Sequence, residues 1–302
     1  MFGRIAKNDI IKFMIVGHKR VIDFLDASVR HDMLSQAYLF VGPEGVGKKH
    51  IAREFSKWLE GKHSDSFFEF TKKLCVCDTC VSIDGGDYAD VRIFSAPLTM
   101  ENAREIKRAC RHTPFFGQYR LIIIDGADSL MHGAGQALLK ELEEPASHTI
   151  FFLITRTSDS VLPTIASRST ILRFRLVPEK EIELLENVKL SEEFIVYGRG
   201  RPGLLFELQN SEVMRKQISE ARNEAELFLR GSIDQRFALA EIVGKKERVE
   251  ISDILERWII FFAQASAFHA VQCIQEAREA IRANGNAQIA LEYAGIRIKN
   301  TE

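Results

Sequence analysis

The segment Gly-Pro-Glu-Gly-Val-Gly-Lys-Lys at residues 42–49 most constrains the fold of this chain. It matches the phosphate-binding pattern G-x-x-x-x-G-K-[ST] at every defined position except the last. In that pattern, backbone N–H groups cradle phosphates, the Lys reaches the β- and γ-phosphates, and the hydroxyl holds Mg²⁺. Here Lys49, a cation, occupies the hydroxyl position. The expected nucleotide-contacting residues of this loop are Gly42, Gly45, Gly47, Lys48 and Lys49.

The residues on either side indicate that this loop joins a strand to a helix. Residues 37–41, Ala-Tyr-Leu-Phe-Val, form a short apolar run, and Ile51, Phe55 and Trp58 then recur at helical spacing. A strand, a glycine turn and a helix N-terminus bind phosphate through free amides and the helix dipole. The alternative is a glycine-rich turn that has no ligand.

A second nucleotide element is predicted at residues 121–128, Leu-Ile-Ile-Ile-Asp-Gly-Ala-Asp. Consecutive branched apolar residues are typical of a strand buried on both faces, and Asp125 stands at its carboxyl end, where ligands bind in open α/β sheets. Active ATPases of this type usually place Glu next, whereas this chain has Gly126. Lys49 and Gly126 together indicate a degenerate site. We therefore expect ATP binding to be weak or absent, and no hydrolysis by the chain alone.

Apolar runs alternate with helical stretches in the first 175 residues, which predicts an α/β domain built on a parallel sheet. One helix is expected to begin near Thr99, and another to end before Pro145 because proline cannot continue it. The expected strands are residues 37–41, 91–94, 121–125, 150–155 and 171–174.

The pattern changes to mostly helical over residues 176–210, interrupted by the Gly-Arg-Gly-Arg-Pro-Gly turn at 198–203, and to all-helical over 211–302. Asn284-Gly285-Asn286 is expected to precede the last helix, to which Ile281, Ile289 and Leu291 are assigned. One apolar helix face in the C-terminal part is predicted from Ile251, Ile254, Leu255, Trp258, Ile259 and Phe262.

These segments, in this order, resemble the AAA+ clamp-loader subunits of bacterial DNA polymerase III, most closely those of the delta-prime type. Residues 16–18, 37–40 and 42–49 carry the general part of the resemblance. Residues 137–145, Ala-Leu-Leu-Lys-Glu-Leu-Glu-Glu-Pro, and 162–169, Leu-Pro-Thr-Ile-Ala-Ser-Arg-Ser, are specific to clamp loaders rather than to P-loop proteins at large.

The resemblance implies a role for single residues. Ser-Arg-Ser at 167–169 replaces the family's Ser-Arg-Cys, and Arg168 stands where the family carries a finger that reaches into the ATP site of the neighbouring subunit. The alternative is a surface arginine paired with a local acid. Thr155 stands where the family has its first nucleotide sensor, and the second sensor arginine cannot be assigned between Arg199 and Arg201.

The resemblance also implies three domains and a function. Residues 1–175 are the expected AAA+ P-loop domain, 176–210 a helical lid, and 211–302 a helical collar that holds five subunits in a ring. We expect a non-catalytic subunit that assists ATP-driven loading of the sliding clamp onto primed DNA, with the other loader subunits, the clamp and primer-template DNA as partners. The alternative is an active AAA+ ATPase, either a loader motor subunit or a chromosome-maintenance ATPase.

Three of the five cysteines, Cys75, Cys77 and Cys80, lie within six residues. They fall in the expected insertion at residues 62–85, where clamp loaders carry a small zinc module. Cys77 and Cys80 have the Cys-x₂-Cys spacing of zinc sites, and His63 is a candidate fourth ligand. The alternatives are an eroded module, reduced thiols or, on these cysteines alone, a zinc protein that binds nucleic acid.

Composition limits the remaining function classes. Lys and Arg number 41 against 42 Asp and Glu, a balance that disfavours a protein that wraps nucleic acid by charge alone. No apolar run approaches the ~18 residues of a membrane span, and no long apolar signal segment begins the chain. We therefore expect a cytoplasmic protein without a membrane partner.

Overall fold

The computed structural model describes residues 15–61, 63, 65–73, 75–131, 133–146, 148–182 and 190–298. Residues 1–14 of the expected α/β domain and residues 183–189 of the expected lid lie outside these described residues. The described residues form two compact units. One comprises those of Met1–Lys189 together with Gly198–Phe206, and the other comprises those of Leu190–Tyr197 together with Glu207–Glu302.

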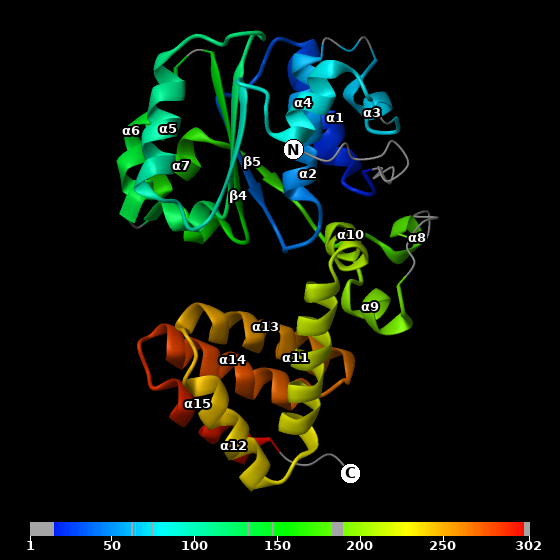
Figure 1. The fold of residues 1–302 in the computed structure, drawn as a ribbon, viewed down its shortest axis with the longest axis vertical. Helices are drawn as coiled ribbons and strands as arrows, with labels where there is room; N and C mark the ends of the chain where they lie inside the picture. Colours follow the sequence, from blue (N-terminus) through cyan, green and yellow to red (C-terminus); the bar gives the residue numbers. More distant parts are fainter. Residues whose placement is uncertain are drawn as a thin grey trace, which may run out of the picture. The chain divides into compact units, whose positions relative to one another are not determined.

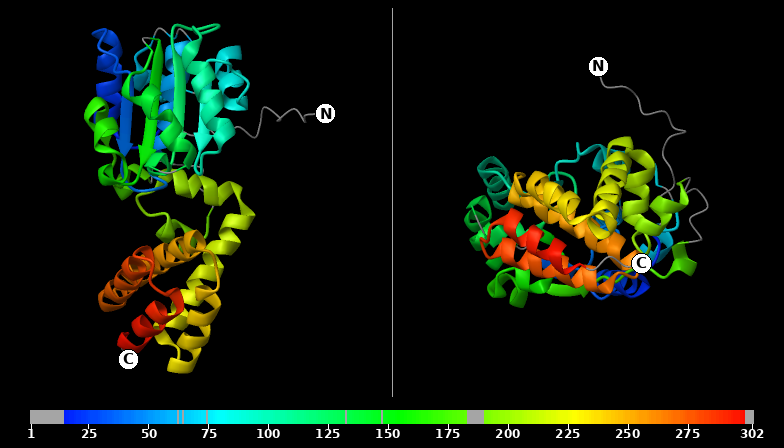
Figure 2. Two further views of the ribbon diagram at one scale, coloured as in Figure 1. Left: turned by 90° about the vertical axis from the view of Figure 1, so that its left-hand side faces the viewer. Right: turned by 90° about the horizontal axis from the view of Figure 1, so that it is seen from below.

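The first unit is built on one parallel five-stranded sheet with strand order β2-β3-β4-β1-β5. Figure 2 shows the strands side by side. The five expected strands are confirmed, each to within one residue at either end. Their apolar runs are buried because helices cover both faces of a parallel sheet of this kind. The strands are β1 (Ala37–Val41), β2 (Val91–Ser95), β3 (Arg120–Asp125), β4 (Thr149–Thr155) and β5 (Thr170–Arg173).

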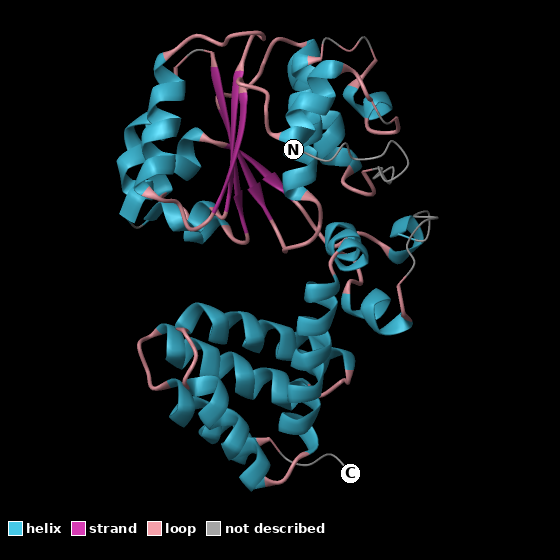
Figure 3. Ribbon diagram, in the orientation of Figure 1, coloured by secondary structure: helices cyan, strands magenta, loops and turns pink. Residues whose placement is uncertain are grey.

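Helices cover both faces of this sheet (Figure 1), and the strands lie between the two layers (Figure 3). Successive strand residues face opposite layers, so Phe40 and Phe152 belong to one core and Leu39 and Leu153 to the other. The first core is closed by α1 (Lys19–Arg30), α2 (Lys48–Glu60), α3 (Phe67–Phe70) and α4 (Asp78–Gly85). The second is closed by α5 (Met100–Arg111), the 3₁₀ helices η1 (Ala127–Met131) and η2 (Gly133–Leu138), α6 (Leu139–Glu143) and α7 (Pro163–Arg168).

Two predicted helix boundaries are confirmed. The Thr99 side chain accepts a hydrogen bond from the Asn102 backbone, and the Asn102 side chain accepts one from Thr99 in return. This capping box starts α5 one residue after Thr99. The helix α6 ends at Glu143, two residues before Pro145.

The segment after β5 crosses between the two units. A short helix, α8 (Glu179–Ile182), precedes the undescribed residues, and α9 (Glu192–Tyr197) belongs to the second unit. The chain then returns to the first unit, where the Val177 backbone N–H donates to the Gly200 carbonyl, before α10 (Pro202–Asn210) begins.

The second unit is a helical bundle around Trp258, whose side chain is fully buried. The predicted apolar face is confirmed, with Ile259 partly buried at its margin and the other predicted residues buried. The bundle helices are α11 (Glu212–Arg230), α12 (Ile233–Gly244), α13 (Arg248–Gln264), α14 (Phe268–Arg282) and α15 (Ala287–Arg297).

The assignment of the last helix needs a correction. Ile281 belongs to α14 and not to the final helix, because the chain breaks after it at Asn284, whose φ is +68°. Asn286 then caps α15 by accepting from the Ile289 backbone N–H. Of the two remaining residues, Leu291 is buried but Ile289 is 64% exposed. Sequence spacing alone did not separate these two faces.

A buried arginine joins three helices of the bundle. Arg236 of α12 donates to the carbonyls of Gly295 and Ile298 at the end of α15 and to that of Leu229 at the end of α11. Helix C-termini leave carbonyls without intrahelical donors, and a cation near them also complements the helix dipole. Arg236 therefore closes two helix ends inside the bundle.

Among the described helices, none combines the length and apolar character that crossing a membrane requires.

Candidate functional site

The P-loop lies where β1 passes into α2, at the carboxyl edge of the sheet. Gly42 has φ +154°, and a Cβ there would lie 2.4 Å from the Phe174 carbonyl oxygen, so only glycine fits. The Gly42 backbone N–H donates to the Thr155 carbonyl on β4. The Leu204 N–H at the start of α10 donates to the Gly45 carbonyl, which places α10 against the loop.

The Lys48 side chain is buried and stabilises the backbone of the P-loop. It is only 6% exposed, and its ammonium donates to the carbonyls of Gly42 at 2.5 Å and Pro43 at 2.6 Å. Burial lowers the pKa of Lys48 to about 8, although the nearby carboxylates of Glu44 and Asp125 oppose this shift. Since an ammonium has three donors, one N–H remains for a ligand.

The loop backbone is also ready to donate. The backbone N–H groups of residues 44–49 have no hydrogen-bond acceptor among the described residues. In the first turn of α2, the Ile51 backbone N–H donates to the Gly47 carbonyl. A run of unpaired N–H groups at a helix start is the arrangement that binds phosphate.

The Lys49 side chain lies beside the carboxyl ends of β2 and β3. Its ammonium lies 3.3 Å from a carboxylate oxygen of Asp125 and donates to the Ser95 hydroxyl at 3.1 Å. Ser95 and Asp125 are register partners at the ends of β2 and β3. The predicted acid is thus brought to the P-loop, but with a cation of the protein already beside it.

Gly126 has no side chain, and its backbone conformation also disfavours any residue that would bring a carboxylate to this position. Its φ is +91°, and an added Cβ would lie 2.5 Å from the Cβ of Ala96. A non-glycine residue would be strained in this left-handed conformation and would also collide with Ala96. A glutamate therefore cannot be introduced at this position without movement of the chain.

The hydroxyl of Thr155 is engaged locally. It donates to the Thr157 carbonyl at 3.1 Å and shares a 2.7 Å hydrogen bond with Ser160. The adjacent Arg156, which sequence reasoning missed, forms an ion pair with Glu44 of the P-loop at 2.5 Å. No sequence signal joined these two residues, because they are far apart in the chain.

The two arginines of the 198–203 turn have different environments. Arg199 is paired with Glu179 at 2.6 Å. Arg201 is half-buried, its Cβ lies 3.3 Å from where a Cβ on Gly45 would stand, and its charge contributes to the lowered pKa of Lys48. Its guanidinium has no hydrogen bond or ion pair with any described residue. Arg201, rather than Arg199, is the arginine beside the P-loop.

Arg168 is the last residue of α7, and Ser169 separates it from the edge strand β5. Its side chain is exposed, and it donates at 3.3 Å to the Thr164 carbonyl of its own helix. Within the described part of the chain it forms no ion pair. The alternative of a local acid partner therefore finds no support among these residues.

The predicted metal ligands come together. One donor atom from each of His63, Cys75, Cys77 and Cys80 lies within 4.8 Å of all the others, and the His63 Nε2 is 3.3 Å from the Cys80 sulfur. Cys77 is the residue that precedes α4, at its N-cap position, and Cys80 lies in the first turn of the helix. All five cysteines are free. One imidazole and three sulfurs are a donor set that fits tetrahedral zinc.

The local environment favours neutral His63 and ionisation of one thiol. Burial lowers the pKa of His63, which leaves the imidazole nitrogen free to bind a metal. Burial raises the pKa of Cys80. Burial also acts to raise the pKa of Cys77, but hydrogen bonds from the Cys80 backbone and neighbouring groups outweigh it and lower that pKa.

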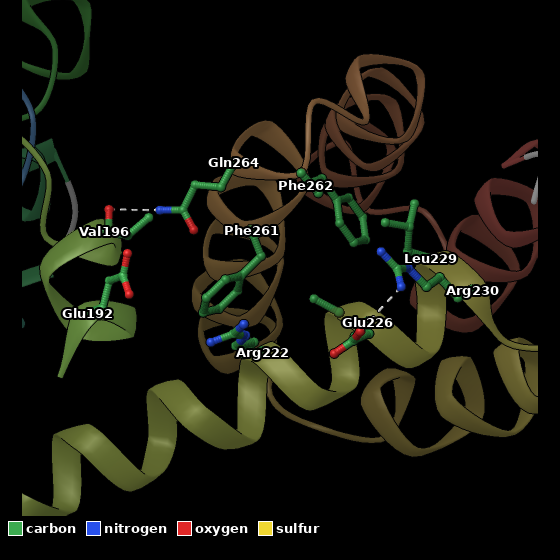
Figure 4. Close-up of a pocket in the computed structure, with 11 residues that line it drawn as sticks. Glu192, Val196, Arg222, Glu226, Leu229, Arg230, Phe261, Phe262 and Gln264 are labelled. Carbon is green, nitrogen blue, oxygen red and sulfur yellow. Dashed lines mark hydrogen bonds and ion pairs between the residues drawn. The ribbon is translucent and has the colours of Figure 1, made fainter. Parts of the chain in front are cut away.

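A separate pocket of about 520 Å³ lies in the second unit, between α9, α11 and α13 (Figure 4). Arg222 and Phe261 line one part of it, and the Glu226–Arg230 ion pair lines another. The Gln264 side chain donates to the Val196 carbonyl. Its charges are balanced and partly paired, so the pocket points to no particular ligand.

A P-loop at the first strand of a five-stranded parallel sheet, followed by a helical C-terminal part, gives the chain an AAA+-like fold. The family model described as "DNA polymerase III, delta subunit" matches residues 17–178, more than half of the chain. The chain therefore belongs to the DNA polymerase III delta subunit family.

Similar proteins include other subunits of DNA polymerase III. The chain is 33% identical over 171 residues to DNA polymerase III subunit tau/gamma of Haemophilus influenzae, covering 56% of this chain and 24% of that protein. It is 31% identical over 176 residues to subunit gamma/tau of Mycobacterium tuberculosis, covering 57% of this chain and 30% of that protein. The match thus spans less than a third of these relatives.

The solved structure of a DNA polymerase III gamma subunit-related protein from Thermotoga maritima has the same fold. It superposes with a TM-score of 0.57 at 17% identity, covering 92% of this chain and 99% of that one. At this identity the likeness concerns the fold alone.

Proposed function

We propose that the chain is a non-hydrolysing subunit of a DNA polymerase III clamp loader, of the delta-prime type. It would assist ATP-driven loading of the sliding clamp onto primed DNA, in a ring with other loader subunits. The observation that carries this proposal is the Lys49–Asp125 ion pair, because the residue at the hydroxyl position of the motif is a cation that contacts the predicted acid. Gly126 removes the second requirement for hydrolysis.

Arg168 is the proposed contribution of this subunit to catalysis. A guanidinium is planar and always charged, and its fork matches phosphate oxygens. Arg168 is exposed at the end of α7 and has no acidic partner among the described residues, so it is free to meet the neighbour's γ-phosphate. A subunit can lose its own hydrolysis and still accelerate that of its neighbour.

We further propose the division into an AAA+ domain at 1–175, a lid at 176–210 and a collar at 211–302. Support for an assembling collar comes from α15, which exposes Ile289, Tyr293 and Ile296 at helical spacing. Apolar side chains gathered on one helix face are typical of interfaces.

We also propose that the cluster of His63, Cys75, Cys77 and Cys80 holds zinc and stabilises the insertion at 62–85.

The isolated chain is expected to hydrolyse ATP no faster than a blank. Lys49 offers no hydroxyl to Mg²⁺, and Gly126 has no carboxylate to polarise water. The measurement is phosphate release with Mg²⁺, with Lys48→Ala as the matched control. Turnover that disappears in Lys48→Ala would contradict the proposal and favour the active AAA+ ATPase instead.

A further inference from the structure

We propose that the P-loop of this chain binds the diphosphate group of a nucleotide without any divalent cation, with Lys49 supplying the positive charge that Mg²⁺ supplies in the motif. The inference rests on the proposed function, because it treats this site as non-hydrolysing. It goes beyond it by assigning the site a ligand class and a metal dependence.

The residues present do not fit Mg²⁺. This ion requires oxygen ligands in near-octahedral geometry, and Lys49 supplies none at the position where the motif has a hydroxyl. The oxygen groups beside Lys49 are the Asp125 carboxylate and the Ser95 hydroxyl. Both already interact with the Lys49 ammonium, at 3.3 and 3.1 Å. A metal would have to displace this ammonium and then tolerate its repulsion.

The donors for a phosphate group are nonetheless in place. They are the unpaired backbone N–H groups of residues 44–49, the third N–H of Lys48 and the guanidinium of Arg201. Lys48 is buried, and burial strengthens its interaction with an anion because less water screens the charge. Arg201 lacks a partner among the described residues, which leaves its charge available to the ligand.

The charge balance around the loop also favours an anion. Lys48, Lys49, Arg156 and Arg201 surround it, and the acids that offset them are Glu44 and Asp125. Four positive and two negative groups leave an excess of two positive charges. A bound metal is therefore not needed to make the site attractive to a diphosphate.

The test is isothermal titration of the full chain with ADP, and in a second arm with pyrophosphate, in either Mg²⁺ or EDTA. We expect wild-type affinity to change by less than about twofold between the two conditions. Lys49→Thr restores the motif hydroxyl and frees Asp125, so its ADP binding should become at least about tenfold tighter in Mg²⁺ than in EDTA.

Two controls locate the effect. Lys140→Thr replaces an exposed lysine of α6 and should leave wild-type behaviour unchanged, and Lys48→Ala should abolish binding while the circular dichroism spectrum stays native. Tighter binding of ADP than of pyrophosphate would identify a nucleotide as the source of the diphosphate, and equal binding would identify any diphosphate.

Absence of binding at millimolar ADP and pyrophosphate would overturn the inference, as would wild-type binding that requires Mg²⁺. Neither result would overturn the proposed loader function, because assembly is measured by gel filtration and the effect of Arg168 is measured at the ATP site of the neighbouring subunit.

Discussion

Replacing Arg168 by Ala should slow ATP hydrolysis at the neighbouring subunit's site in a reconstituted loader by on the order of 10³ or more. The change removes the guanidinium that meets the developing charge on the transferred phosphate. Arg168→Lys should recover little, because a point charge on a flexible stem does not reproduce the planar fork. The measurement is clamp-dependent and DNA-dependent ATP turnover together with clamp loading.

The isolated Arg168→Ala subunit should remain folded, within about 0.5 kcal/mol of wild type, because the side chain is exposed. Gel filtration should show an intact assembly, which separates a catalytic defect from an assembly defect. Arg20→Ala, an exposed arginine on α1, is the matched control and should load normally. Normal loading by the Arg168→Ala assembly would make the Ser-Arg-Ser segment a structural remnant.

Protein purified without chelator should contain about one zinc per chain, and Cys80→Ala should lower this nearly to zero. Cys80 is the buried member of the cluster, so its loss removes a ligand and leaves a cavity beside His63. Because metal binding is coupled to folding of small modules, the melting temperature should also fall on chelation. Elemental analysis and thermal unfolding measure the two effects.

Cys110→Ala is the matched control for this experiment. Cys110 is also buried, but in the core on the other face of the sheet, away from the cluster. It should retain zinc while losing some stability to the cavity. A zinc content near zero in wild type, with five titratable thiols, would indicate an eroded module.

The sheet could be predicted from the sequence because its strands are uniformly apolar. The run at 121–125 has no polar residue before Asp125, and such a run is buried wherever it folds. The spacing of Cys75, Cys77 and Cys80 likewise predicted the cluster, and His63 was a candidate ligand because it lies twelve residues before Cys75.

Long-range side-chain pairs could not be predicted in this way. The sequence shows that Lys49 replaces a hydroxyl, but not that its ammonium reaches Asp125, because that depends on where α2 begins relative to the end of β3. The position of Arg201 depends on α10 returning to the P-loop after an excursion of the chain into the second unit. The positive φ of Gly126 is a backbone property that the amino-acid type permits but does not specify.

The most direct test of the proposed loader function is affinity purification of the tagged full chain from its own cells at moderate salt, followed by gel filtration and mass spectrometry. The proposed loader function predicts that the chain elutes in one large complex, in stoichiometric amount with other DNA polymerase III clamp-loader subunits. Elution as a free chain, or with proteins unrelated to DNA polymerase III, would contradict it.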